Sequence, residues 1–445
     1  MAKPAEARLV RSIRRWDLVA VTINAVIGAG IFGLPARVFG LIGDFSVVAF
    51  LVCAVFASLI VICFAEVGSR FSETGGPYLY AREAFGSVVG FEAGWLMWLA
   101  RVSAFAANAN LLVGYAGYFL PVIARGAGRN VFLCTVAASL MAINIIGVRN
   151  AARANNLFTA GKLIPIALFL VAGLWFTDWD RFTFAVAPGY AQFSTSVLLL
   201  VYAFTGFEMA VIPSGEIRDP QKNIPIALLT AIAVIASVYL LIQIVCIGTL
   251  PELASSQRPL ADAASRFMGR AGASIISAGI VISIAGNLHI TLLSASRIPF
   301  AMAERGELPR FLGVTHTRFH TPHSAILLTG AVMLVLTISG TFIYALTIST
   351  LARLMIYITT CAALPVLRRK AGAPRALLQV PGGVAVAAAA ILLACWLLSN
   401  STWREARDTA IAAVLGFVIF AASGLHQANV KRTEEPGSQN GISAG

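Results

Sequence analysis

The sequence predicts an all-α integral membrane protein with twelve transmembrane helices. Hydrophobic residues make up 58% of its 445 residues and charged residues only 12%, and the mean hydropathy is +0.82. So few charged side chains cannot cover the surface of a soluble protein of this length. Apolar runs of about 20 residues, long enough to cross a bilayer as a helix, recur twelve times along the chain.

The expected spans cover residues 17–40, 45–69, 88–121, 130–149, 155–176, 193–213, 224–250, 272–301, 323–341, 343–367, 382–399 and 409–427. Lys and Arg are more frequent in the loops on the side of the N-terminus than in the opposite loops, which places both termini in the cytoplasm. Residues 1–16 then form a cytoplasmic tail, and the polar residues 428–445 form a disordered one. Loops 70–87 and 251–270 each have the apolar spacing of a short helix.

The first span contains a break. Three glycines, Gly28, Gly30 and Gly33, and Pro35 fall within residues 26–35. Each interior Gly costs a helix about 1 kcal/mol and an interior Pro about 3 kcal/mol. A membrane helix tolerates such a break only where other protein or a water-filled cavity satisfies the freed backbone groups. The stretch therefore predicts a small-molecule site.

A second break occurs in the sixth span, where residues 202–208 read Tyr-Ala-Phe-Thr-Gly-Phe-Glu and Pro213 and Gly215 follow. Interrupted apolar segments at corresponding places in two halves are typical of a transporter built from inverted repeats. We expect residues 17–180 to form the first repeat of five spans and residues 181–370 the second. Residues 371–427 add two further spans.

Other site chemistries find little support. The net charge of +13 comes from Lys and Arg in short loops rather than from one basic face, which excludes a nucleic-acid partner. The six cysteines lie in apolar segments without paired spacing, and His316, His320 and His323 lie in a basic loop without nearby acids. The sequence therefore predicts no metal site, no cofactor and no enzyme activity.

Four stretches together resemble the amino acid, polyamine and organocation (APC) superfamily of transporters. They are residues 28–32 (Gly-Ala-Gly-Ile-Phe), residues 65–71 leading into Gly75-Gly76-Pro77-Tyr78, residues 214–225 and residues 301–306. Their order and places match the superfamily over nearly the whole chain, with most likeness to its arginine/agmatine antiporter branch. The resemblance implies the LeuT-like fold of five plus five inverted spans, with spans 1 and 6 discontinuous, and amino acid or amine cargo.

The first break then corresponds to the family's carboxylate cradle. If the span unwinds at Gly28, the N–H groups of Ala29, Gly30 and Ile31 open a second half-helix whose positive end can hold a carboxylate. The other interpretation is a glycine-lined helix crossing. The substrate's ammonium group is expected at backbone carbonyls that have lost their helical donors, those of Ile23, Asn24, Tyr202, Ala203 and Thr205.

Gating and coupling residues are expected around the second break. The family places an aromatic lid there, and gating falls to whichever ring, Tyr202 or Phe204, faces the first span. Glu208 resembles a glutamate proposed as pH sensor in the arginine/agmatine antiporters, and an acid in mid-membrane indicates a proton carrier or an ion-pair partner. Arg101 and Arg353 also fall inside spans, and the sequence leaves open which of them pairs with Glu208.

Lys162 matches a lysine that many family members carry in the fifth span, where its ammonium takes the place of a sodium ion. The resemblance implies that it bridges unwound carbonyls of the first span to the eighth span and makes sodium unnecessary. The alternative is that the side chain snorkels to the cytoplasmic face.

Side-chain selectivity is expected from spans 3 and 8. Phe105 and Thr291 stand where the arginine/agmatine antiporters have a polar residue and a tryptophan. This departure argues against guanidinium cargo and favours a neutral or apolar side chain. Asn287 and His289, about a turn earlier in the eighth span, are either substrate contacts or interhelical hydrogen-bond partners.

The sequence thus predicts a sodium-independent amino acid permease of the bacterial inner membrane that works by alternating access, as an exchanger or a proton-linked uniporter. Its partners are the amino acid, the lipid bilayer and, in the proton-linked case, protons. A polyamine or cationic amino acid antiporter is the alternative, and a polytopic membrane enzyme or a channel is the alternative of another class. The individual substrate, the direction of net flux and the choice between monomer and homodimer stay open.

Overall fold

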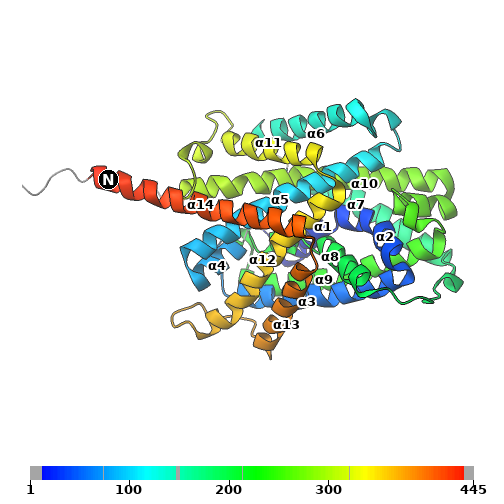
Figure 1. Cartoon of the computed structure of the whole chain (residues 1–445), viewed down its shortest axis with the longest axis horizontal. Helices are drawn as coiled ribbons and strands as arrows, with labels where there is room; N and C mark the ends of the chain where they lie inside the picture. The colour runs from blue at the N-terminus through cyan, green and yellow to red at the C-terminus, as the bar shows by residue number, and fades with distance from the viewer. Residues whose placement is uncertain (1–12, 74, 147–150, 213, 320, 435–445) are drawn as a thin grey trace, which may run out of the picture.

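The computed structural model describes residues 13–73, 75–146, 151–212, 214–319 and 321–434. Over these ranges the chain forms a bundle of α-helices without a β-strand (Figure 1). Seven helices of this described part are long and apolar enough to cross a membrane, or eight if the bent pair α13 and α14 is one span. Residues 161–175 and 323–339 form shorter apolar helices, so the count of twelve spans stays a prediction.

The α-helices are α1 (Arg15–Val26), α2 (Ala29–Ile42), α3 (Ser46–Gly68), α4 (Pro77–Phe85), α5 (Ser87–Ala116), α6 (Gly126–Ile146), α7 (Ala151–Trp175), α8 (Tyr190–Ala203), α9 (Pro220–Thr249), α10 (Pro259–Glu304), α11 (His323–Ser339), α12 (Phe342–Arg369), α13 (Gly383–Ser399) and α14 (Trp403–Glu434). Short 3-10 turns lie between several of them. Pro213, His320 and residues 1–12 and 435–445 of the two tails lie outside the described residues.

The tail after Gln427 departs from the prediction. Residues 428–434 continue α14 to Glu434, where the sequence analysis expected disorder from residue 428. The stretch includes Ala428, Lys431 and Arg432, which are good helix formers and extend a helix that is already nucleated. In Figure 1 this end of α14 projects beyond the bundle.

The first predicted span is divided into α1 and α2. Helix α1 ends at Val26, and α2 begins at Ala29 after Gly28 in an extended conformation, with φ −139° and ψ −153°. Pro35, which the sequence analysis grouped with the break, lies inside α2 instead. A Cβ atom at Gly33 would lie 2.9 Å from the Phe342 ring, so this glycine permits close packing rather than a break.

The second predicted break follows α8. The helix ends at Ala203, and the chain turns at Gly206, whose φ of +116° favours glycine. A 3-10 turn, η4 (Phe207–Ala210), continues the segment. A Cβ atom at Gly206 would lie 2.5 Å from the carbonyl oxygen of Ala25, so the turn also needs glycine because it contacts α1.

The long helices α5, α10 and α12 pack around these two breaks (Figure 1). Helix α12 packs against α5, and α10 packs against both α5 and α7. Helix α10 contains a kink at Gly269, with φ +62°, which separates a short helix at residues 259–268 from the long remainder. This short helix and α4 lie in the loops where the sequence predicted them.

Candidate functional site

The two broken segments meet in the interior of the bundle. The Tyr239 hydroxyl of α9 lies 3.0 Å from the carbonyl oxygen of Val26, at the end of α1, and 3.0 Å from that of Ala203, at the end of α8. Carbonyls at a helix end lack an intrahelical donor. The fully buried Tyr239 therefore joins the ends of both helices.

The start of α2 also rests directly on the end of α8. A Cβ atom at Gly30 would lie 2.6 Å from the Cα atom of Ala203, a separation that no larger residue can accept without a shift. Gly30 therefore allows α2 and α8 to pack closely, and without a side chain it leaves its own backbone uncovered. This close approach fits the helix-crossing interpretation of the glycine, and the carboxylate cradle stays a prediction.

Lys162 of α7 contacts the same break. Its Nζ atom donates hydrogen bonds to the carbonyl oxygens of Asn24 at 2.8 Å and Ile27 at 2.6 Å, and the side chain is 3% exposed. The burial is contrary to snorkelling. The bridge to the eighth span is not formed, because among the described residues Lys162 has no hydrogen bond to α10.

These contacts change the expectation for the substrate's ammonium group. The carbonyl oxygen of Asn24 already accepts from Lys162, and that of Ile23 accepts from the Ile27 N–H at 2.9 Å. Ile23 lines neither of the two spaces described below. Of the five carbonyl residues proposed from the sequence, Tyr202 and Thr205 line the inner space.

Asn108 of α5 is a site residue that the sequence analysis missed. Its side-chain oxygen accepts from the Ala29 N–H at 3.3 Å, and its amide donates to the Tyr202 hydroxyl at 3.1 Å. One of the three N–H groups assigned to the carboxylate cradle is thus already bonded. The signal was available, because Asn108 stands seven residues, about two helical turns, after Arg101 and shares its face of the helix.

Two adjacent spaces, which share five lining residues, lie at the breaks. The inner chamber has a volume of about 60 Å³ and is lined by Gly28, Ala29, Gly30, Asn108, Tyr202, Thr205, Thr291 and Arg353, among others. The vestibule has a volume of about 590 Å³ and extends past Asn24 and Lys162 to Gly75, Tyr78 and Arg305. Ala25, Arg101, Met209, Asn287 and Ile290 line both. The volume of the vestibule is within the range usual for small-molecule sites.

Several predicted residues lie away from these spaces. Phe204 is 1% exposed and packs edge-on against Tyr239, with the ring centroids 5.2 Å apart. Tyr202, and not Phe204, therefore borders the chamber. Phe105, Ile31 and Ala203 are buried and line neither space. Which face of α5 carries the Phe105 ring depends on the packing of the bundle, and the Ala203 carbonyl instead accepts from the Tyr239 hydroxyl.

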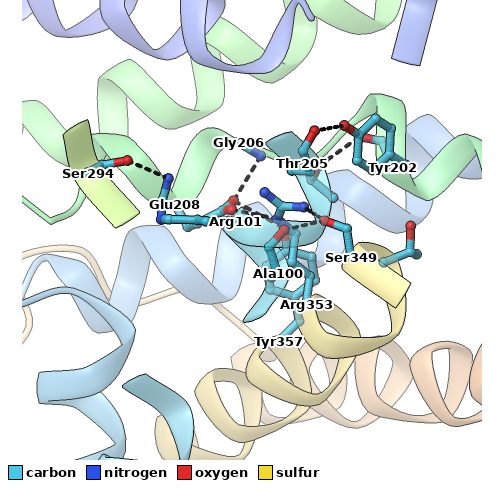
Figure 2. Close-up of polar contacts among 12 residues, drawn as sticks. Ala100, Arg101, Tyr202, Thr205, Gly206, Glu208, Ser294, Ser349, Arg353 and Tyr357 are labelled. Atoms are coloured by element: carbon cyan, nitrogen blue, oxygen red, sulfur yellow. Dashed lines mark hydrogen bonds and ion pairs between the residues drawn. The ribbon is translucent and has the colours of Figure 1, made fainter. Parts of the chain in front are cut away.

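The ion pair left open by the sequence is formed by Arg353. Its Nε atom lies 2.9 Å from Oε1 of Glu208 (Figure 2). The other carboxylate oxygen accepts from the Tyr357 hydroxyl at 3.1 Å and from the Gly206 N–H at 2.9 Å. Glu208 is thus a fully bonded buried carboxylate that ties the second break to α12. It does not line the inner chamber.

Arg101 has a different environment. Its Nη1 atom donates to the Ser294 hydroxyl of α10 at 3.2 Å (Figure 2). Its Nε and Nη2 atoms have no hydrogen-bond partner among the described residues, and the salt bridges within 4.0 Å in the described part of the chain do not include Arg101. The side chain is only 4% exposed. Arg101 is therefore a buried cation beside the site that forms no salt bridge among the described residues.

Two further polar clusters involve the sequence motifs. Glu66 of α3 is fully buried and receives two hydrogen bonds of 2.6 Å from Arg368, which join α3 to the end of α12. At the outer end of the vestibule, Arg305 donates to the Tyr78 hydroxyl at 2.6 Å. Arg82 lies 3.5 Å from Glu307. The motifs at residues 65–71 and 301–306 thus contribute to contacts between helix ends.

Three histidines in the described part of the chain contact other side chains. In that part, no group of three or more His, Cys, Asp or Glu residues has the arrangement of a metal site. His316 and His323 contact each other with ring centroids 5.5 Å apart. His289 lies 3.3 Å from the Asn144 amide of α6, so it forms an interhelical contact, whereas Asn287 lines both spaces.

A comparison with known proteins assigns the family. The family model described as amino acid permease matches residues 13–425. The chain belongs to this family. Because the family members are transporters and not enzymes, the permease is a multi-pass membrane transporter of the APC superfamily.

Several relatives resemble the permease over most of their length. The serine/threonine exchanger SteT of Bacillus subtilis (strain 168) is 29% identical over 373 residues, which cover 82% of this chain and 84% of the relative. The methylthioribose transporter of the same organism is 27% identical over 448 residues, covering 95% and 94%. The putative arginine/ornithine antiporter of Bacillus subtilis (strain 168) is 27% identical over 383 residues, which cover 78% of this chain and 80% of the relative.

Proposed function

We propose that this permease is a secondary-active amino acid transporter that binds its cargo between the two broken segments and works by alternating access. The observation that carries the proposal is the inner chamber, which lies where the ends of α1 and α8 meet and shares lining residues with a vestibule that reaches the exposed Arg305. The family and the exchanger among its relatives support amino acid cargo and exchange.

The first turn of α2 is the proposed carboxylate site. Gly28, Ala29 and Gly30 line the chamber, and the first N–H groups of a helix have no intrahelical acceptor and lie at its positive end. The α-carboxylate would bind the N–H groups of Gly30 and Ile31 and replace Asn108 at Ala29. The ammonium group would bind near Thr205, which also lines the chamber.

We propose twelve spans with the five-plus-five inverted repeat, both termini in the cytoplasm and a location in the bacterial inner membrane. On this topology Gly75, Tyr78 and Arg305 are on the cytoplasmic side, so the vestibule opens to the cytoplasm and the structure corresponds to an inward-facing state. Lys162 supports sodium independence because its ammonium contacts the carbonyls that end α1.

The structure weakens the argument for cargo with a neutral or apolar side chain. It rested on Phe105 and Thr291, and of these two only Thr291 lines the chamber. A cationic cargo, as the putative arginine/ornithine antiporter would suggest, conflicts with the basic side chains around the site. The side-chain class is argued in the next subsection.

Counterflow in proteoliposomes tests the proposed function. Purified permease is reconstituted, and uptake of labelled amino acids is measured with and without unlabelled amino acid inside, in sodium-free buffer. Saturable uptake that is stimulated from the opposite side is expected for at least one amino acid. Flux that does not saturate and shows no such stimulation would indicate a channel, and conversion of the cargo would indicate an enzyme.

A further inference from the structure

The charged side chains that line the two spaces are all basic. Arg101, Lys162, Arg297 and Arg305 line the vestibule, and Arg353 and again Arg101 line the inner chamber. None of the described residues that line either space is Asp or Glu. A cleft lined by one sign of charge concentrates ligands of the opposite sign. The lining therefore favours anionic over cationic cargo.

Most of these cations have partners elsewhere. Arg353 pairs with Glu208, and Lys162 donates to two backbone carbonyls that end a helix. Arg297 donates to the carbonyl oxygen of Leu293 at 3.0 Å, and Arg305 binds the Tyr78 hydroxyl. Arg101 differs from them, because two of its three guanidinium nitrogens have no partner among the described residues.

The position of Arg101 suits a contact with the cargo's side chain. The inner chamber, at about 60 Å³, is too small to hold a whole amino acid, so a cargo bound by its carboxylate at α2 must extend into the vestibule. Arg101 lies where the two spaces join. Arg101 forms no salt bridge among the described residues, and burying a guanidinium without a directly paired carboxylate is unfavourable. A carboxylate on the cargo would provide that pair.

We propose that Arg101 is a substrate-binding residue that pairs with a carboxylate on the cargo's side chain, so that the cargo is an acidic amino acid such as glutamate or aspartate. This assignment rests on the proposed function and specifies its substrate class. Arginine is suited to the contact because its planar guanidinium can bind a carboxylate through two parallel hydrogen bonds.

Glu208, which lies near Arg101, suggests a competing role for this arginine. Arg101, Glu208, Arg353 and Tyr357 border a narrow gap between α5 and α12. Arg101 could then exchange with Arg353 as the partner of Glu208 during transport, without contacting the cargo. The two roles differ in one measurable respect: a substrate contact discriminates between cargoes, whereas an exchange of ion-pair partners affects all cargoes alike.

The first experiment uses the wild-type permease in proteoliposomes. Counterflow of glutamate, aspartate, glutamine, leucine and lysine is compared, with glutamine as the neutral isostere of glutamate. We expect kcat/KM for glutamate or aspartate to exceed that for glutamine by roughly a hundredfold or more, because the amide leaves the guanidinium charge unpaired. Transport of glutamine, leucine or lysine without the acids would overturn the acidic assignment and leave the proposed function intact. If no amino acid shows counterflow, the proposed function itself fails.

The second experiment compares Arg101→Ala with Arg129→Ala. Arg129 is a half-buried arginine that lines neither space and instead donates to Asn110 and to the carbonyl oxygen of Thr337. Arg101→Ala should lose acidic cargo selectively and favour glutamine, whereas Arg129→Ala should keep the wild-type ratio. An equal loss of all cargoes, or an unchanged ratio, would overturn the substrate contact. If Arg101→Ala is not inserted into the membrane, thermal unfolding of the wild type is measured with glutamate and with glutamine. Stabilisation by glutamate alone supports the proposal, and equal stabilisation by both overturns it.

Discussion

The ammonium nitrogen of Lys162 lies 2.6 Å from the carbonyl oxygen of Ile27, the residue that follows the last turn of α1. The same nitrogen lies 2.8 Å from the Asn24 carbonyl oxygen. One cation therefore satisfies two carbonyls released by the break, in the interior of the bundle and next to the vestibule. A fixed positive charge at this place supports the proposal that transport needs no sodium ion.

Lys162→Met should abolish transport in sodium-free buffer. The change removes two charge-assisted hydrogen bonds, each of which contributes about 1.5 to 3 kcal/mol, and it leaves the Asn24 and Ile27 carbonyls unpaired in a buried place. Counterflow at a series of sodium concentrations checks this. The matched control is Lys222→Met, at an exposed position of α9. Full activity of Lys162→Met, or steep sodium dependence of the wild type, would contradict the proposed role.

Both breaks could be predicted from the sequence because their causes are local. Glycine within an apolar run weakens a helix wherever the run lies in the fold, so Gly28 and Gly206 are informative without any knowledge of packing. The position of Pro35 inside α2 was not predictable in this way. A proline interrupts one hydrogen bond, and whether the helix continues depends on its neighbours.

The partners of the breaks could not be predicted because they come from distant helices. Asn108 and Tyr239 lie in α5 and α9, and each reaches the broken segments only through the packing of the bundle. The choice between Arg101 and Arg353 as partner of Glu208 depends likewise on how α5 and α12 are rotated about their axes. Phe105 shows the same limit, since its ring lies outside both spaces.

The two glycines at the start of α2 should respond differently to alanine. A Cβ atom at Gly30 would lie 2.6 Å from the Ala203 backbone, whereas one at Gly28 would lie 3.4 Å from the Asn287 amide, an ordinary contact. We expect Gly30→Ala to lower both the melting temperature and transport, and Gly28→Ala to lower transport with little change in stability. Fluorescence-detected thermal unfolding and counterflow of both variants check this. Equal melting temperatures for the two variants would count against the close packing of α2 on α8.

The Glu208–Arg353 pair should be strongly coupled. Glu208→Gln leaves a buried guanidinium without its counter-ion, and removing one partner of a buried pair typically destabilises a protein by about 3 to 5 kcal/mol. The double variant with Arg353→Met should recover part of this loss. The exposed Arg266–Glu252 pair, at 2.7 Å, is the matched control, and its removal should change the free energy of unfolding by about 1 kcal/mol or less. Additive effects of Glu208→Gln and Arg353→Met would contradict coupling.

Glu208→Gln also tests whether this carboxyl senses pH. If Glu208 exchanges a proton during transport, the variant should lose the pH dependence of counterflow that the wild type shows. An unchanged pH profile would reduce Glu208 to a structural partner of Arg353. Arg353→Lys keeps the positive charge and serves as the control for damage to the pair itself.

Glu307 should make the stability of the cluster at the outer end of the vestibule depend on pH. Burial raises the pKa of the Glu307 carboxyl above its ordinary value, although Arg82, Arg305 and Tyr78 act in the opposite direction. The folded state therefore binds this proton more tightly than the unfolded state. The resulting stabilisation is fully present below the ordinary pKa of a carboxyl group and is lost as the pH rises through the raised value.

Glu307→Gln keeps the side chain neutral at every pH and should remove this pH-dependent stabilisation. As the pH is raised from acidic values toward neutral, the melting temperature of the variant should therefore fall less than that of the wild type. Glu304→Gln, at the exposed end of α10, should retain the wild-type profile. Thermal unfolding in detergent across that pH range measures both. A pH profile of Glu307→Gln identical to that of the wild type would show that this carboxyl is already ionised throughout the range.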